Sequence, residues 1–227
     1  MVRTGSDLGN RFFLYSPTVL RRCRLNVQPS IIYLVDDDKR IRESLTAMLT
    51  SAGHHVITFE SATAYLSFPK PDVPACLILD LQLPGMSGLE LQKELALTSD
   101  PPVIFLTAHG NISSSVKAMK AGAAEFLLKP FNSAELISAV ESAIRKDREV
   151  RSEKIELRSI QEKYQSLTPR ERDVLPLVVS GLVNKQTADQ LGVSEVTIRL
   201  HRGQIMRKMG AESFAALVRM AARLNIP

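Results

Sequence analysis

Five short apolar runs alternate with helical patterns between residues 31 and 147, and this alternation limits the fold more than any other feature of the chain. The runs are expected to be strands at 31–35, 55–59, 76–80, 103–106 and 125–128. Between them, apolar residues recur at the spacing of an amphipathic helix, as in Ile41, Leu45 and Leu49. Repeated βα units predict an α/β fold with a doubly wound, five-stranded parallel sheet and helices on both faces.

The last sixty residues follow a different plan, in which short helices are separated by glycines. Residues 168–171 (Thr-Pro-Arg-Glu) have the pattern of a capping box with proline at the first helical position. Gly181 ends this helix, a second is expected over 184–191, and Ser194 caps a third that reaches residue 209. With a fourth helix behind it, this outline predicts an all-α, four-helix domain of the helix-turn-helix type.

The chain is therefore expected to have four segments. They are a loosely ordered N-terminal extension (1–30), the α/β domain (31–147), a charged helical linker (148–166) and the helix-turn-helix domain (167–227). In the linker, Val150, Leu157 and Tyr164 recur every seven residues. This stripe either packs on the chain's own domain or forms a short coiled coil between two chains.

Net charge changes sign along the chain. Residues 31–147 have ten Lys/Arg and fourteen Asp/Glu, a net charge of −4, whereas residues 148–227 have fourteen and nine, a net charge of +5. The basic C-terminal part predicts contact with a polyanion. No apolar run approaches the ~20 residues of a membrane span, so we expect a cytoplasmic protein without a membrane partner. The two cysteines, Cys23 and Cys76, are too few for a disulfide framework.

Polar side chains end several of the predicted strands, where parallel sheets place their sites. These residues are Asp36, Asp37, Asp80, Thr107 and Lys129. Clustered carboxylates resist ionisation unless a cation compensates them, and Mg²⁺ prefers oxygen ligands. Asp37 and Asp80 could each give one oxygen, the main-chain carbonyl of Gln82 a third, and Asp36 could orient a bound water.

Such a site can carry phosphoryl chemistry. Asp80 can attack phosphorus and form an aspartyl phosphate. Lys129 would contact the phosphoryl oxygens as a point charge, and the hydroxyl of Thr107 could donate to another of them.

The helix that begins after Ser194 has two different sides. A core side is expected to comprise Ile198, His201, Ile205 and Met209, and the outward side Val196, Arg199, Leu200, Gly203 and Arg207. Outward aliphatics flanked by arginines suit a DNA major groove, where they contact thymine methyl groups, guanine and phosphate. Arg202 and Lys208, at the flanks, are expected to hold the DNA backbone.

Several of these motifs closely resemble a known family. The α/β part resembles a two-component receiver domain through Val35-Asp36-Asp37-Asp38, Asp80 with Pro84-Gly85-Met86-Ser87-Gly88, Leu106-Thr107-Ala108-His109 and the segment 122–131. The C-terminal part resembles a LuxR-type DNA-binding domain through residues 167–171, 178–182 and 196–198. The pairing is similar to FixJ-like response regulators.

The resemblance implies a flavodoxin-like receiver in which Asp80 accepts phosphate from a sensor histidine kinase with Mg²⁺. It makes Thr107 and Phe126 the switch pair and Lys129 the phosphate-binding lysine, with a cis Lys129–Pro130 bond. Gln82 and His109 would tune hydrolysis of the acyl phosphate.

On this reading the chain is not an enzyme beyond assisting its own phosphoryl transfer and hydrolysis. It would form homodimers on phosphorylation and bind promoter DNA, with RNA polymerase as a further partner. Gly203 stands where relatives often have a base-contacting side chain; it costs the helix ~1 kcal/mol but permits close approach of the backbone.

Two other functions compete with this one. A haloacid-dehalogenase-like phosphatase also uses an aspartate at a strand end, but it needs a second aspartate two residues on, where this chain has Gln82. An adaptor or RNA-binding regulator could use the C-terminal helices differently. The outward arginines and the helix-turn-helix spacing favour duplex DNA.

Overall fold

The computed structural model describes residues 30–95, 101–108, 116 and 118–227, which divide into two compact units between Asp147 and Arg148. Nearly all of the N-terminal extension, including Cys23, and also His109 lie outside the described residues. Among the residues described, no helix combines the length and the apolar character needed to cross a membrane.

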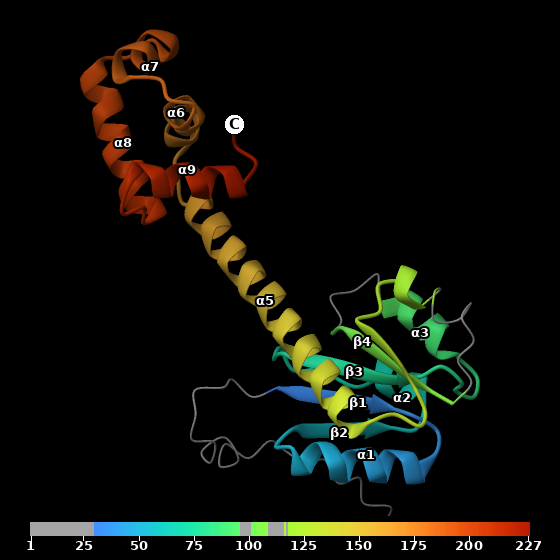
Figure 1. Cartoon of the computed structure of the whole chain (residues 1–227). Helices are drawn as coiled ribbons and strands as arrows, with labels where there is room; N and C mark the ends of the chain where they lie inside the picture. The colour runs from blue at the N-terminus through green and yellow to red at the C-terminus, as the bar shows by residue number, and fades with distance from the viewer. Residues whose placement is uncertain (1–29, 96–100, 109–115, 117) are drawn as a thin grey trace, which may run out of the picture. The chain divides into compact units, whose positions relative to one another are not determined.

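The first unit is built on one parallel sheet (Figure 1). Its strands are β1 (Ile31–Val35), β2 (His55–Phe59), β3 (Ala75–Asp80), β4 (Val103–Thr107) and β5 (Glu125–Leu128). They are ordered β2-β1-β3-β4-β5, and every neighbouring pair is parallel. The predicted doubly wound, five-stranded parallel sheet is confirmed, and only β3 and β4 differ from the predicted bounds, by one residue each.

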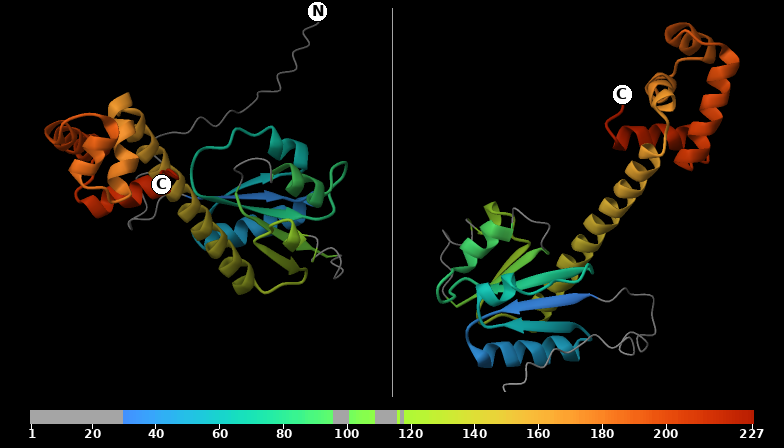
Figure 2. Two further views of the ribbon diagram at one scale, coloured as in Figure 1. Left: turned by 90° about the horizontal axis from the view of Figure 1, so that it is seen from above. Right: turned by 180° about the vertical axis from the view of Figure 1, so that it is seen from behind.

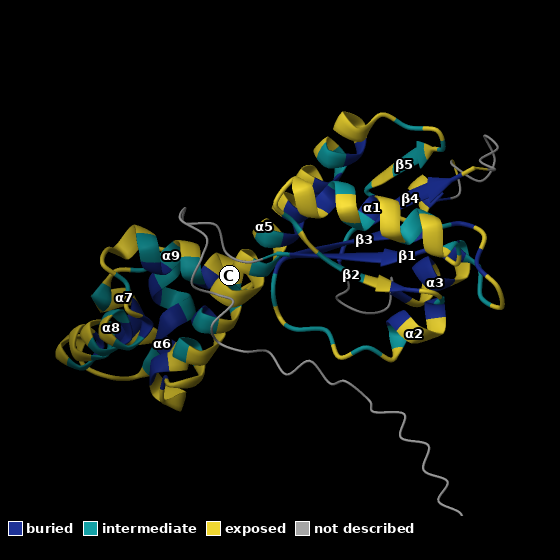
Figure 3. Ribbon diagram, turned by 90° about the horizontal axis from the view of Figure 1, so that it is seen from below, coloured by how far each residue is buried: buried dark blue, intermediate teal, exposed yellow. Residues whose placement is uncertain are grey.

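Helices cover both faces of the sheet because side chains alternate along each strand. On one face Leu34 and Ile78 pack with α1 (Lys39–Ser51) and the first turns of α5 (Ser133–Gln165). On the other, Tyr33 and Leu77 pack with α2 (Ala62–Leu66) and α3 (Gly88–Leu95). Strands β1 and β3 are therefore buried on both sides, as their dark blue colour in Figure 3 shows.

The second unit is all-helical. After the end of α5 it comprises α6 (Pro169–Val179), α7 (Asn184–Leu191), α8 (Glu195–Met209) and α9 (Phe214–Arg223). The predicted capping box is confirmed: the Thr168 N–H donates to Glu171 Oε2 at 2.7 Å, and the Glu171 N–H donates to Thr168 Oγ1 at 3.3 Å. Gly192 and Gly210 end α7 and α8 in the left-handed conformation, with φ of 65° and 64°.

Helix α5 runs without a break through the predicted linker, as both views of Figure 2 show. Ile160, near its end, is 3% exposed in the core of the second unit, where Tyr164 and Leu167 also pack. Of the stripe residues Val150, Leu157 and Tyr164, only Tyr164 is among the residues that pack in this core, and the coiled-coil alternative for the other two stays a prediction. Val150, further upstream, remains 40% exposed.

Candidate functional site

Three carboxylates converge at the carboxyl ends of β1 and β3. Val35 pairs with Leu79 in adjacent strands, so the residues that follow them meet at one edge of the sheet. Asp36 is 2% exposed, Asp80 is half-buried, and Asp37 is exposed. Each offers an oxygen within 4.8 Å of the others. The sequence prediction that these strand ends form one acidic pocket agrees with this geometry.

Lys129 inserts its ammonium group into this pocket from the segment after β5. Its Nζ lies 2.8 Å from Asp36 Oδ2 and 3.3 Å from Asp80 Oδ2. Its backbone N–H donates to the carbonyl of Thr107 at 2.8 Å, which ties the end of β5 to the end of β4. The Lys129–Pro130 bond is cis, as the resemblance implied.

Burial raises the pKa of Asp80, and the nearby Lys129 ammonium opposes that rise. A second contribution that raises the pKa of Asp80 is the charge of Asp36. The pocket contains three carboxylates and one lysine ammonium group, so one lysine cannot neutralise all three when they are ionised. The atoms that could bind a metal ion are all oxygens. This donor set fits a hard divalent cation such as Mg²⁺.

The predicted site residues around Asp80 differ in burial. The Gln82 side chain is exposed, and its backbone N–H donates to Asp80 Oδ1 at 3.4 Å. Thr107 is buried at the end of β4. The Phe126 ring packs against Phe105, with 6.2 Å between ring centroids.

Arg42 lies on α1 and binds the acidic loop, which is the segment that carries Asp36 and Asp37. The sequence did not indicate this role. Arg42 Nη1 donates to the main-chain carbonyls of Asp36 at 2.7 Å and Asp37 at 2.9 Å. These bonds fix two successive peptide groups, and so the directions in which both carboxylates leave the backbone. An arginine six residues after the first aspartate gives no signal by itself, because its partners are main-chain atoms.

Gly88 is a second residue whose role the sequence reading missed. A Cβ at this position would collide with the main-chain oxygen of Asp80, and the Gly88 N–H donates to the Leu81 carbonyl at 3.0 Å. The loop after β3 can therefore fold back against Asp80 only with glycine here. The Pro-Gly-Met-Ser-Gly pattern was the available signal.

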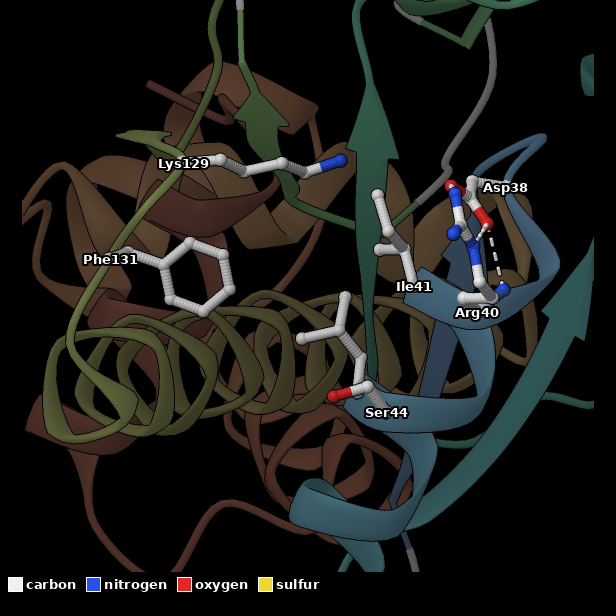
Figure 4. A pocket seen from close by; sticks show the side chains of 7 residues that line it. Asp38, Arg40, Ile41, Ser44, Lys129 and Phe131 are labelled. Atoms are coloured by element: carbon white, nitrogen blue, oxygen red, sulfur yellow. Dashed lines mark hydrogen bonds and ion pairs between the residues drawn. The ribbon is translucent and has the colours of Figure 1, made fainter.

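A shallow pocket adjoins the acidic site (Figure 4). The start of α1 contributes Arg40 and Ile41 to its wall, and the segment after β5 contributes Lys129 and Phe131. Asp38 caps α1 by accepting from the Arg40 N–H at 2.8 Å. The acidic pocket is thus open to solvent beside Lys129.

Helix α8 has the two sides that its sequence predicts. Ile198, Ile205 and Met209 are fully buried, and His201 is half-buried. On the other side Val196 is 71% exposed and Leu200 63% exposed. These two aliphatics line a shallow hollow together with Arg199, Gly203, Gln204 and Arg207.

The two flanking cations of α8 have partners inside the domain. The Arg202 guanidinium lies 5.5 Å from the centre of the Phe214 ring. Lys208 Nζ donates to Glu171 Oε2 at 2.6 Å, which joins α8 to the capping box of α6. Glu171 therefore engages the charge of Lys208 inside the domain, and the DNA-backbone contact of Lys208 stays a prediction.

Glu171 is a buried carboxylate at the start of α6. Burial opposes its ionisation, but hydrogen bonds from Lys208 and Thr168 outweigh burial and lower the pKa of Glu171. Thr187 of α7 is also buried, and its hydroxyl donates to the Val183 carbonyl at 3.2 Å.

An acidic strand-end site on a doubly wound sheet, followed by a helix-turn-helix domain, defines a transcription regulator that receives a signal at one domain and binds DNA with the other. Residues 32–141 match the response regulator receiver domain, and residues 165–221 match the LuxR family of bacterial regulatory proteins. The chain belongs to the two-component response regulators that join a receiver to a LuxR-type DNA-binding domain and regulate transcription.

Relatives and solved structures cover most of the chain. Nodulation protein W of Bradyrhizobium diazoefficiens is 45% identical over 87% of this chain and 87% of its own length. The transcriptional regulatory protein FixJ of Rhizobium meliloti is 42% identical over 84% and 94%. The structure of response regulator StyR matches with a TM-score of 0.79 and 43% identity, over 86% of this chain and 99% of that one. Family membership implies a histidine kinase and DNA as partners.

Proposed function

We propose that a sensor histidine kinase phosphorylates Asp80 in a Mg²⁺-dependent reaction, and that the aspartyl phosphate controls dimerisation and sequence-specific binding to promoter DNA. One observation carries the proposal: Lys129 Nζ lies 2.8 Å from Asp36 and 3.3 Å from Asp80, in a pocket of converging carboxylates. The arrangement supplies a nucleophile and a cation for the phosphoryl group.

In the proposed reaction an Asp80 carboxylate oxygen attacks phosphorus. The bond between phosphorus and the kinase imidazole nitrogen breaks, and its electron pair returns to the imidazole. Lys129 then moves its ammonium from the Asp80 carboxylate toward the phosphoryl oxygens. Asp36, Asp37, Asp80 and the Gln82 carbonyl would hold Mg²⁺, which screens the negative charge of the incoming group.

The switch assignment to Thr107 and Phe126 is part of the same proposal. The Thr107 hydroxyl would turn to the phosphoryl group, and the Phe126 ring would follow it inward. The buried position of Thr107 and the packing of Phe126 on Phe105 support a coupled movement of the two side chains. The receiver catalyses only its own phosphorylation and hydrolysis, so the chain is not an enzyme in the ordinary sense.

For the second domain we propose that α8 reads the major groove of duplex DNA through Val196, Arg199, Leu200, Gly203 and Arg207. Exposed aliphatics beside exposed arginines support this assignment. Arg202 and Lys208 would contact the DNA backbone from the flanks. We place this function in the cytoplasm, with a homodimer that forms on phosphorylation and with RNA polymerase as a further partner.

The phosphorylation proposal is tested with full-length protein, acetyl phosphate and Mg²⁺. Asp80→Asn should abolish the acid-stable, base-labile label, whereas Asp72→Asn, a change of an exposed aspartate in the same domain, should keep it. Removal of Mg²⁺ should also abolish labelling. Label that persists in Asp80→Asn would remove Asp80 from its role. Sedimentation with beryllofluoride should show dimers; a monomer in both states would contradict the dimerisation step.

The DNA proposal is tested with Arg199→Ala, which should weaken specific binding by about 1–3 kcal/mol. The matched control is Arg219→Ala, which removes an exposed arginine from α9. An unchanged footprint for Arg199→Ala would exclude this residue as a reader. Equal binding of single-stranded RNA would favour the RNA-binding alternative.

A further inference from the structure

Among the glycines that the structure describes, all but one stand where the backbone conformation or a close contact requires glycine. Six glycines have positive φ angles, which side chains rarely adopt: Gly53, Gly85, Gly122, Gly181, Gly192 and Gly210. Gly88 has no room for a Cβ beside Asp80. Gly203 is the only glycine among the described residues that has neither reason.

Gly203 lies within α8 and does not have the positive φ angle that favours glycine. A Cβ at this position would meet no atom within 4 Å. Alanine would therefore fit without strain. A helix with glycine in its interior is less stable than one with alanine there, because glycine loses more backbone freedom when the chain folds. The protein thus carries a destabilising residue for which its own packing gives no reason, and a partner that contacts α8 would supply one.

The surroundings of Gly203 indicate the chemistry of that contact. Gly203 lies in the shallow hollow of α8, in which Val196 and Leu200 are the apolar residues and Arg199 and Arg207 the cations. Large aliphatics that are 71% and 63% exposed are expected where a partner covers them. The two arginines and the net charge of +5 over residues 148–227, from fourteen Lys/Arg and nine Asp/Glu, favour an anionic partner.

We infer that Gly203 is a specificity-determining residue, and that the hollow it opens in α8 receives the 5-methyl group of a thymine. This inference rests on the proposed function of α8 as the DNA reader. Thymine fits because its methyl group is the apolar feature of the major groove, while phosphates satisfy the cations. A side chain at position 203 would fill the hollow and hold the helix away from the bases. The protein thus reads one base by shape.

The test begins with a duplex enriched from a random pool by the full-length wild-type protein with beryllofluoride and Mg²⁺. Gly203→Ala should make α8 more resistant to hydrogen exchange and yet bind the enriched duplex about tenfold more weakly. Its binding to unrelated duplex should be unchanged. Glu195→Ala, a truncation of an exposed residue of α8 that does not line the hollow, is the control and should not combine these two opposite effects.

Duplexes in which single thymines are replaced by uracil test the thymine methyl directly, because uracil lacks only that group. At one position in each half-site, uracil should weaken binding of the wild-type protein severalfold and leave binding of Gly203→Ala unchanged. If Gly203→Ala binds the enriched duplex as tightly as the wild type, or if uracil weakens both proteins equally, the inference is wrong while the proposed function stands. If the wild type enriches no duplex, both fail.

Discussion

Replacing Lys129 with methionine tests the charge balance of the acidic pocket. The change keeps most of the side-chain volume but removes the cation that lies 2.8 Å from Asp36 and 3.3 Å from Asp80. Asp36 is 2% exposed, and the side chains of Asp80 and Lys129 are 13% and 15% exposed, so water replaces little of the lost interaction. We expect the receiver to lose about 3 kcal/mol of unfolding free energy at pH 7, the lower end of the range for breaking a buried ion pair.

The pH dependence of this loss follows from the carboxylates. Lys129 lowers the pKa of Asp80, so its removal raises a pKa that burial has already raised. A carboxyl group whose pKa is higher in the folded state destabilises the fold once it ionises in the unfolded state. The difference in unfolding free energy between variant and wild type should therefore be largest at neutral pH and should shrink as the pH falls toward about 4. Mg²⁺ at 100 times its dissociation constant should restore about 2.7 kcal/mol to the variant.

Native-state hydrogen exchange is the suitable assay because it resolves the two units. Peptides from β1 and β3 report the receiver, and peptides from α6 serve as an internal reference. Lys93→Met, which removes an exposed lysine from α3, is the control and should change stability by less than about 0.5 kcal/mol. If Lys129→Met matches this control and does not respond to Mg²⁺, the pocket does not depend on this cation and the electrostatic reasoning is refuted.

Two further predictions concern contacts that only the structure reveals. Arg42→Met should weaken Mg²⁺ binding about tenfold, as measured by calorimetric titration, because the carbonyls of the acidic loop lose their donor; Arg40→Met, which changes a highly exposed neighbour, should bind Mg²⁺ normally. Glu171→Gln should destabilise the DNA-binding unit by about 1–3 kcal/mol at pH 7. Since the pKa of Glu171 is lowered, this contribution is present above the ordinary value of 4.5 and is lost as the pH falls through the folded pKa. Thermal unfolding that shows equal losses at pH 7 and pH 3 would contradict this assignment.

The parts of this structure that follow from local pattern were predictable from the sequence. Strands buried on both faces read as continuous apolar runs, and the Asp80 strand illustrates this with the run Cys76–Leu79. The two sides of α8 follow from helical spacing alone. The contacts of Arg42 and Lys208 were not predictable, because one has main-chain carbonyls as partners and the other a carboxylate 37 residues away. Such contacts depend on where the fold places the backbone.

The packing of the last turns of α5 affects how the DNA-binding domain can be excised. Ile160 is buried among the helices of that domain, and Glu156 forms an ion pair with Arg223 of α9 at 2.5 Å. A fragment cut at residue 167, where the recognisable motif begins, would lose one wall of its core, at a cost comparable to the ~2–5 kcal/mol of an isoleucine-to-alanine truncation. A stable fragment should start upstream of Glu156, so the folded domain is longer than the motif by which it is recognised.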